Sequence, residues 1–145
     1  MIEIDTVDHI GIRVSDLDRA VAFYELLGFE VFVRATGDAV VIMRNPYGIE
    51  LNLIYNATDT NAGRNVLMDV DEKYPGYTHI ALGVTSLPNT IRFLKDNSIV
   101  ITQGPVDFGG GQVAVFIRDP DLNVIELRGT EREDTVIEGV APYIP

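Results

Sequence analysis

An internal repeat is the sequence feature that most constrains how this chain can fold. Residues 8–27 and residues 78–97 align without a gap at a constant offset of 70. Each copy then closes with a related phrase, which reads RNPYGIELNL in residues 44–53 and RDPDLNVIEL in residues 118–127. Because both ends of both copies agree in order, chance similarity between apolar strands is a poor explanation. We infer two modules of the same design.

The pattern of each module predicts one strand, one helix and three further strands. In the first module, alternating apolar and polar residues over 7–14 predict a strand. Ser15 with Asp18 resembles a capping box, and an apolar stripe at helical spacing runs to Gly28, where we expect the helix to end. Further strands are expected near residues 29–34, 39–44 and 49–55, with a turn at 45–48.

The second module repeats this order. We expect a strand at 78–84 and a helix at 87–96 that begins after Ser86. The expected strands that follow lie near residues 99–103, 112–118 and 123–128. The predicted organisation is a first module over 5–57, a linker over 58–76, a second module over 77–130 and a C-terminal extension over 131–145.

Composition excludes several classes of function. The 22 acidic residues outnumber the 11 basic ones, and the net charge of −11 argues against binding to nucleic acid or to an anionic membrane surface. No apolar run is long enough to span a membrane, and the N-terminus lacks the pattern of a signal peptide, so we expect a cytoplasmic protein. Because the chain has no cysteine, any metal must be held by histidine, carboxylate, amide or water ligands.

Two histidines and one glutamate form the strongest candidate site. His9 and His79 are the only histidines, and they occupy equivalent positions in the two modules. If the modules curve toward each other, both imidazoles can point at one metal ion, which we favour over two structural histidines. Glu126 lies between Ile125 and Leu127, which face the opposite side of the last strand. A sheltered carboxylate there is costly unless it is paired or bound to metal.

The first module offers two candidates for a fourth group. Asn52 lies six residues after Pro46, just as Glu126 lies six residues after Pro120, so the gapless repeat favours Asn52 as the equivalent position. Glu50 shares its strand face and offers a charged oxygen, so ligand chemistry favours Glu50. The sequence alone therefore leaves both Asn52 and Glu50 as candidates for the fourth metal ligand.

Arg13 lies on the same strand face as His9 and has two interpretations of equal weight. It holds a substrate carboxylate, or it pairs with Glu50 or another acidic residue of the chain. The glycines at 109–111 precede a strand rather than a helix, so we interpret them as a loop near the site and not as a phosphate-binding loop.

These phrases resemble the vicinal oxygen chelate superfamily, which includes glyoxalase I, methylmalonyl-CoA epimerase, extradiol dioxygenases, and the fosfomycin and bleomycin resistance proteins. The resemblance covers residues 5–130, and its wording is nearest to glyoxalase I in GYTHIALGV and RDPDLNVIEL. It implies an α+β fold in which two tandem βαβββ modules form a curved mixed sheet around a cleft. Members of this size commonly form homodimers.

The resemblance also implies roles for individual residues. It makes His9, His79, Glu126 and Asn52 metal ligands, although Asn52 departs from the Glu or Gln of the related enzymes. Arg13 and Asn56 match positions that contact glutathione. Glu126 and Glu50 are the candidate catalytic carboxylates, with Glu126 preferred as a ligand.

The resulting prediction is a divalent-metal-dependent lyase or isomerase of glyoxalase I type. It would act on a small carbonyl compound or its thiol adduct, including a glutathione conjugate, through a metal-chelated enediolate, with Ni, Zn, Mn, Fe or Co as the ion. One alternative is an extradiol dioxygenase or fosfomycin-type thiol transferase with a two-His, one-Glu site. Another is a metal-free protein of bleomycin-resistance type that sequesters a ligand.

Overall fold

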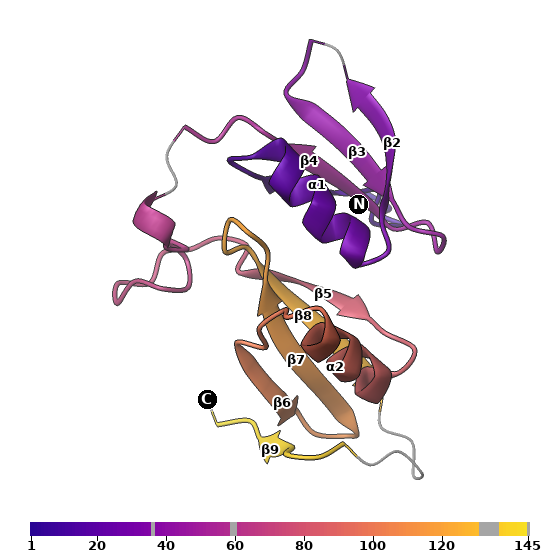
Figure 1. Cartoon of the computed structure of the whole chain (residues 1–145), viewed down its shortest axis with the longest axis vertical. Coiled ribbons are helices and arrows are strands. Elements are labelled where there is room, and N and C mark those ends of the chain that lie inside the picture. Colours follow the sequence, from indigo (N-terminus) through magenta and orange to yellow (C-terminus); the bar gives the residue numbers. More distant parts are fainter. Residues whose placement is uncertain (36, 59–60, 131–136, 145) are drawn as a thin grey trace. The chain divides into compact units, whose positions relative to one another are not determined.

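The structure is a computed structural model that describes residues 1–35, 37–58, 61–130 and 137–144. The chain divides into two compact units, Met1–Asn65 and Val66–Pro145. The division falls inside the predicted linker, so each unit takes part of it. Each unit contains one long helix and one mixed sheet (Figure 1). None of the helices in the described residues has the length and apolar character that a membrane span requires.

The first unit has the strand and helix order that the repeat predicts. Its strands run in the order β1-β4-β3-β2, with β1 parallel to β4 and the other neighbours antiparallel. A short 3-10 helix, Asn61–Gly63, lies at the end of the unit. The main elements are β1 (Ile10–Arg13), α1 (Leu17–Leu26), β2 (Glu30–Ala35), β3 (Val40–Arg44) and β4 (Glu50–Ile54).

The second unit repeats this topology and adds one strand. The sheet order is β5-β8-β7-β6-β9, in which β5 and β8 are parallel and correspond to β1 and β4. The added strand β9 comes from the C-terminal extension and pairs in parallel with β6. The elements are β5 (His79–Gly83), α2 (Leu87–Asp96), β6 (Gln103–Asp107), β7 (Gln112–Arg118), β8 (Val124–Thr130) and β9 (Ala141–Pro142).

In each unit the helix covers one face of its sheet (Figure 1). The apolar stripe of α1 buries Ala20, Val21 and Tyr24. In β4 the burial alternates, so that Leu51 and Leu53 are fully buried while Glu50, Asn52 and Ile54 are half-buried. Since successive strand residues face opposite sides, Glu50 and Asn52 lie on the face opposite to that of the two leucines.

The start of α1 differs from the prediction. The N-cap is Asp16 and not Ser15, because Asp16 has the extended backbone of a cap and its carboxylate accepts a hydrogen bond from Arg19 N at 3.0 Å. The Ser15 hydroxyl instead accepts from the Arg19 side chain. In α2 the predicted cap is confirmed, since the Ser86 side chain accepts from Asn89 N.

One strand of the second unit begins later than predicted. The repeated order of elements predicted a strand near residues 99–103, but β6 runs from Gln103 to Asp107. The reason is that Ile99 still belongs to the end of the helix, where its N–H donates to Leu94 O at 2.8 Å. Pairing with β7 is established only from Thr102, whose N–H donates to Phe116 O at 2.8 Å.

Gly129 tests how tightly α2 packs on β8. A Cβ at Gly129 would lie 2.7 Å from Leu87 Cβ, closer than two carbons can approach. We expect Gly129→Ala to lower the free energy of unfolding by about 1–3 kcal/mol, measured by urea denaturation, because the helix must shift.

The matched control is Gly83→Ala in β5 of the same unit. A Cβ there meets no atom of the described residues within 4 Å, so the free energy of unfolding should change by less than about 0.5 kcal/mol. Equal effects of the two substitutions would contradict the packing account.

Candidate functional site

The second unit brings His79 and Glu126 together. His79 opens β5 and Glu126 lies in the adjacent parallel strand β8, where the register pairs Ala81 with Glu126. His79 Nε2 lies 3.2 Å from Glu126 Oε2. The Glu126 side chain is only 7% exposed, whereas the His79 side chain is 36% exposed. The pair therefore consists of a buried carboxylate and an imidazole that solvent and ligands can reach.

One oxygen of Glu126 lacks a hydrogen bond. Among the residues that the structure describes, no donor bonds to Glu126 Oε1, and the nearest cation, Arg128 Nη1, is 3.9 Å away. A buried carboxylate oxygen is costly when it is left in this state. The position therefore suits a cation or a ligand that supplies the missing interaction.

Two neighbouring side chains, Thr78 and Phe116, orient the imidazole ring of His79. The Thr78 hydroxyl lies 2.9 Å from His79 Nδ1, and the ring of Phe116 packs edge-on against the imidazole at 5.9 Å between centroids. Nε2 is thereby directed at Glu126. Two ligands at about 2.1 Å from one ion are separated by about 3.0–3.4 Å for right-angled to tetrahedral arrangements, so the 3.2 Å separation fits a shared metal ion.

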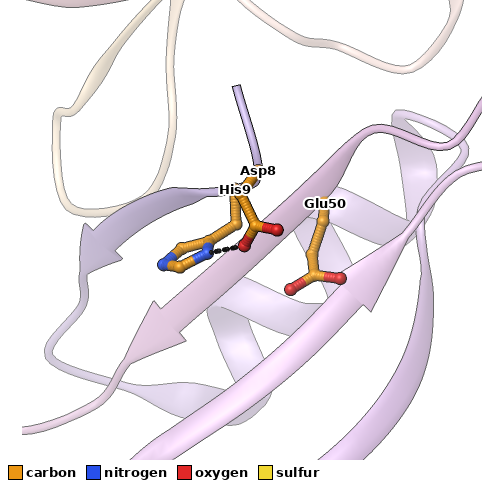
Figure 2. Close-up of side chains that lie close together, drawn as sticks. All are labelled: Asp8, His9 and Glu50. Carbon is orange, nitrogen blue, oxygen red and sulfur yellow. Dashed lines mark hydrogen bonds and ion pairs between the residues drawn. The ribbon is translucent and has the colours of Figure 1, made fainter. Parts of the chain in front are cut away.

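The first unit places His9 beside two carboxylates. His9 Nδ1 lies 2.6 Å from Asp8 Oδ1, and one potential ligand atom from each of Asp8, His9 and Glu50 lies within 4.8 Å of the others (Figure 2). Glu50 is also held by Arg44, whose Nε donates to Glu50 Oε2 at 2.7 Å. With Nδ1 of His9 engaged by Asp8, Nε2 is the nitrogen available to a metal.

The strand register identifies the counterpart of Glu126. In the first unit β1 pairs Gly11 with Asn52, and in the second unit β5 pairs Ala81 with Glu126. Gly11 and Ala81 each lie two residues after the histidine of their module, so Asn52 occupies the place of Glu126. Asn52 Oδ1 is buried and has no hydrogen-bond partner within the described part of the chain. Both equivalent positions thus carry an unsatisfied oxygen.

The two predicted substrate-binding residues contact each other. Arg13 Nε donates to Asn56 Oδ1 at 3.1 Å, which joins the end of β1 to the segment after β4. An arginine oriented in this way keeps a planar set of donors in a fixed position, which is a suitable arrangement for a carboxylate.

A pocket of about 340 Å³ surrounds the His79–Glu126 pair. The sequence analysis did not identify most of its walls. One of them, Arg128, could have been found, because it lies two residues after Glu126 and strand alternation puts it on the same face. The pocket is lined by Met68, Thr78, His79, Gln103, Phe108, Phe116, Glu126, Arg128 and Tyr143.

The loop between β6 and β7 contributes the wall at Phe108. The glycines at 109–111, each with positive φ, form the turn of this hairpin, and Phe108 N donates to Gln112 O at 2.9 Å. The turn thus separates two strands and opens no helix, in agreement with its interpretation as a loop near the site.

Two repeated modules that each carry a histidine and a polar residue on paired parallel strands are features that can be compared with known protein families. The family model described as the Glyoxalase/Bleomycin resistance protein/Dioxygenase superfamily matches residues 6–127. The chain belongs to this superfamily.

Curated relatives within this family carry different names. The chain is 31% identical to virulence protein STM3117 of Salmonella typhimurium, over 86% of this chain and 83% of the relative. It is 31% identical to a lactoylglutathione lyase of Haemophilus influenzae, over 82% and 88% of the two chains. It is also 29% identical to metallothiol transferase FosB of Staphylococcus epidermidis, over 86% and 82%.

A solved structure supports the same fold. The crystal structure of SMU.1112c superposes with a TM-score of 0.71 at 26% sequence identity, covering 87% of this chain and 99% of that chain. The chain covers 82% to 88% of the lengths of the curated relatives named above and 99% of this solved structure. The predicted superfamily and α+β fold are confirmed.

Proposed function

We propose that this protein is a divalent-metal-dependent lyase or isomerase of glyoxalase I type, acting on a small carbonyl compound or its thiol adduct. The observation that carries the proposal is the His79–Glu126 pair, in which a buried carboxylate oxygen lacks a hydrogen bond beside an accessible imidazole nitrogen. The names of several relatives favour the same chemistry, since they include lactoylglutathione lyases. The proposal keeps the expectation of a cytoplasmic homodimer.

The proposed ligands come from equivalent positions of the two modules. These are His9 and Asn52 in the first module and His79 and Glu126 in the second. The fit is supported by the unsatisfied oxygens of Asn52 and Glu126 and by the absence of cysteine from the sequence. Nitrogen and oxygen donors of this kind suit Zn, Ni, Mn, Fe or Co. When bound, the ion would act as a Lewis acid on the oxygens of the substrate.

Glu50 is the proposed proton carrier. It lies on the same strand face as Asn52 and within reach of His9, and Arg44 fixes its orientation through Oε2. In a lyase or isomerase of this type, a carboxylate removes a proton from the carbon next to a carbonyl and returns it to the neighbouring atom. This role leaves Glu126 free to act as a ligand.

Arg13 and Asn56 are proposed to bind the part of the substrate that does not react. Their contact fixes the guanidinium at the end of β1, where its N–H groups can donate to a carboxylate such as those of a glutathione adduct. Because the chain carries a net charge of −11, binding of an anion must depend on a few arginines of this kind.

A thiol transferase is the second candidate. The observation in its favour is the similarity to metallothiol transferase FosB. His9, His79 and Glu126 would by themselves supply the two-His, one-Glu set that this activity needs, and Asn52 would then be dispensable. A metal-free sequestering protein is disfavoured, because such a protein has no need of both histidines and Glu126.

Metal content tests the ligand assignment. We expect the wild-type protein to retain about one divalent ion per chain. We expect His79→Ala and Glu126→Gln to lower the affinity for that ion by about 10-fold or more, because the first removes a ligand atom and the second replaces a charged oxygen with a neutral amide oxygen. The measurement is metal analysis after dialysis, with competition by a chelator to give the affinity.

Glu25→Gln, an exposed position on α1, serves as the control and should retain the wild-type affinity. Equal and negligible metal in the wild type and in His79→Ala would remove the metal proposal. Retention by His79→Ala together with loss in Asp8→Asn would move the ion to the Asp8–His9–Glu50 group.

Turnover tests the reaction. We expect conversion of the hemithioacetal of methylglyoxal and glutathione in the presence of a divalent metal, and a decrease in kcat of about 100-fold or more in Glu50→Gln, since a general base is removed. Glu25→Gln should behave like the wild type.

The same assay is run with a catechol and with fosfomycin plus a thiol, across several divalent metals. Conversion of fosfomycin with no conversion of the hemithioacetal would replace the lyase by the thiol transferase.

A further inference from the structure

Among the residues that the structure describes, Arg128 is the one arginine or lysine that lines the pocket of the second unit, and its hydrogen-bond donors are poorly satisfied. Arg128 lies two residues after Glu126 on β8, so both side chains project from the same face. Arg128 Nε is buried and makes no hydrogen bond within the described residues. In the part of the chain that the structure describes, Arg128 forms one ionic contact, the 3.9 Å separation between Nη1 and Glu126 Oε1, which is long for a charge-assisted hydrogen bond. The Arg128 side chain is 40% exposed and lines the pocket, so its guanidinium can donate to a ligand there.

Aromatic side chains form the wall beside this guanidinium. The ring of Phe108 lies 5.8 Å from Arg128 Cζ, and Tyr143 packs on Phe108 with ring centroids 4.9 Å apart. Phe108 and Tyr143 remain 38% and 47% exposed although they contact each other. Apolar surface exposed on the wall of a pocket is available to a ligand.

One of the two rings of this wall comes from outside the repeat. Tyr143 belongs to the C-terminal extension, and its N–H donates to Asp107 O at 3.0 Å, directly after the β9 pairing with β6. Because the backbone fixes Tyr143 to the sheet, the aromatic wall exists before a ligand binds. A preformed wall lowers the cost of binding.

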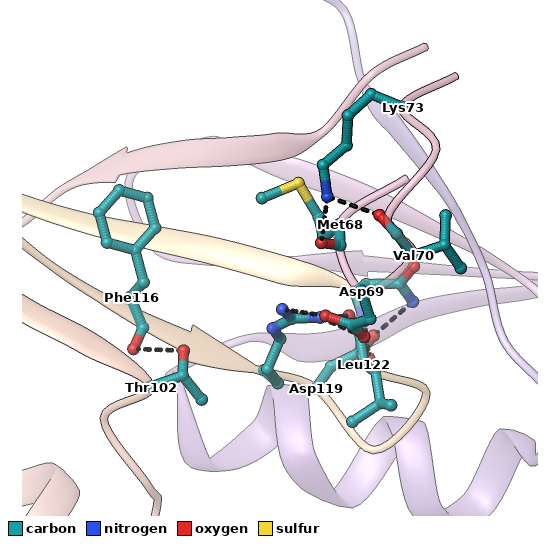
Figure 3. Close-up of polar contacts among 10 residues, drawn as sticks. Met68, Asp69, Val70, Lys73, Thr102, Phe116, Asp119 and Leu122 are labelled. Carbon is teal, nitrogen blue, oxygen red and sulfur yellow. Dashed lines mark hydrogen bonds and ion pairs between the residues drawn. The ribbon is translucent and has the colours of Figure 1, made fainter. Parts of the chain in front are cut away.

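The linker contributes Met68 to the lining of the pocket. Arg118 holds the next residue, Asp69, in a two-bond ion pair, with Nη2–Oδ1 at 2.8 Å and Nη1–Oδ2 at 3.2 Å. Lys73 Nζ donates to the carbonyls of Met68 and Val70, so the linker folds over itself here (Figure 3). Met68 is therefore held in position as well.

We propose that this pocket binds a small carboxylate-bearing compound with a planar apolar body, in which Arg128 binds the carboxylate while Phe108 and Tyr143 contact the body. The volume of about 340 Å³ lies at the lower end of the range of about 300–1,000 Å³ for small-molecule pockets. The inference rests on the proposed function in one respect. A metal ion bound to Glu126 would neutralise the negative charge of that carboxylate, so that the positive charge of Arg128 would be available to the ligand.

The test compares two probes of equal shape and different charge, phenylacetate and phenylacetamide. Affinities are measured by calorimetric titration, once with zinc and once with a chelator. We expect the wild type to prefer phenylacetate by about 10-fold or more with zinc, because hydrogen bonds to a charged group are the stronger ones. Arg128→Gln should abolish this preference and leave the affinity for phenylacetamide unchanged.

Two further variants separate the parts of the pocket. Tyr143→Ala should weaken both probes by the same factor, since it removes contact with the body and not with the charge. Arg92→Gln, an exposed arginine on α2, should match the wild type for both probes.

Absence of a preference in the wild type, or a wild-type preference in Arg128→Gln, would overturn the inference. The comparison of the two probes on the wild-type protein tests the inference even if a variant fails to fold. Zinc content is measured in the same samples. A wild type that binds no zinc contradicts the proposed function, and the titration with chelator then decides the role of Arg128 independently.

Discussion

The candidate site depends on the parallel pairing of the first and last strands of each repeated module, β1 with β4 and β5 with β8. Parallel neighbours in one sheet require a crossover, and in both units the intervening helix and strands provide it. This pairing sets His79 beside Glu126 and places Asn52 at the equivalent point of the first sheet. A shift of one residue in the register would turn Glu126 in the second unit, or Asn52 in the first, toward the helix-covered core.

The two units share this frame but differ in chemistry. The second unit places a buried carboxylate next to its histidine, whereas the first has the neutral Asn52 at that point and a carboxylate, Glu50, two residues earlier on the same face. Glu50 is bound by Arg44, while the oxygen of Asn52 lacks a partner among the described residues. This division is consistent with a ligand role for Asn52 and a proton-carrying role for Glu50.

The sequence predicted the structural features that the two modules share and missed those that lie outside the repeat or at its boundaries. Equivalent histidines, strand alternation and the shared closing phrases led to the strand order and to the choice of His79 and Glu126 as candidate site residues. The cap at Asp16 and the late start of β6 were missed, because neighbouring polar residues compete for a cap and Ile99 satisfies both a strand and a helix end. Tyr143 and Met68 could not be predicted as pocket walls, since no periodicity records where a linker or an extension packs.

The most direct test of the account is the location of a bound metal by anomalous X-ray scattering from crystals grown with zinc or cobalt. The account predicts an ion within bonding distance of His79 Nε2 and Glu126. An ion bound by Asp8, His9 and Glu50 alone, or no ion at His79 and Glu126, would contradict it.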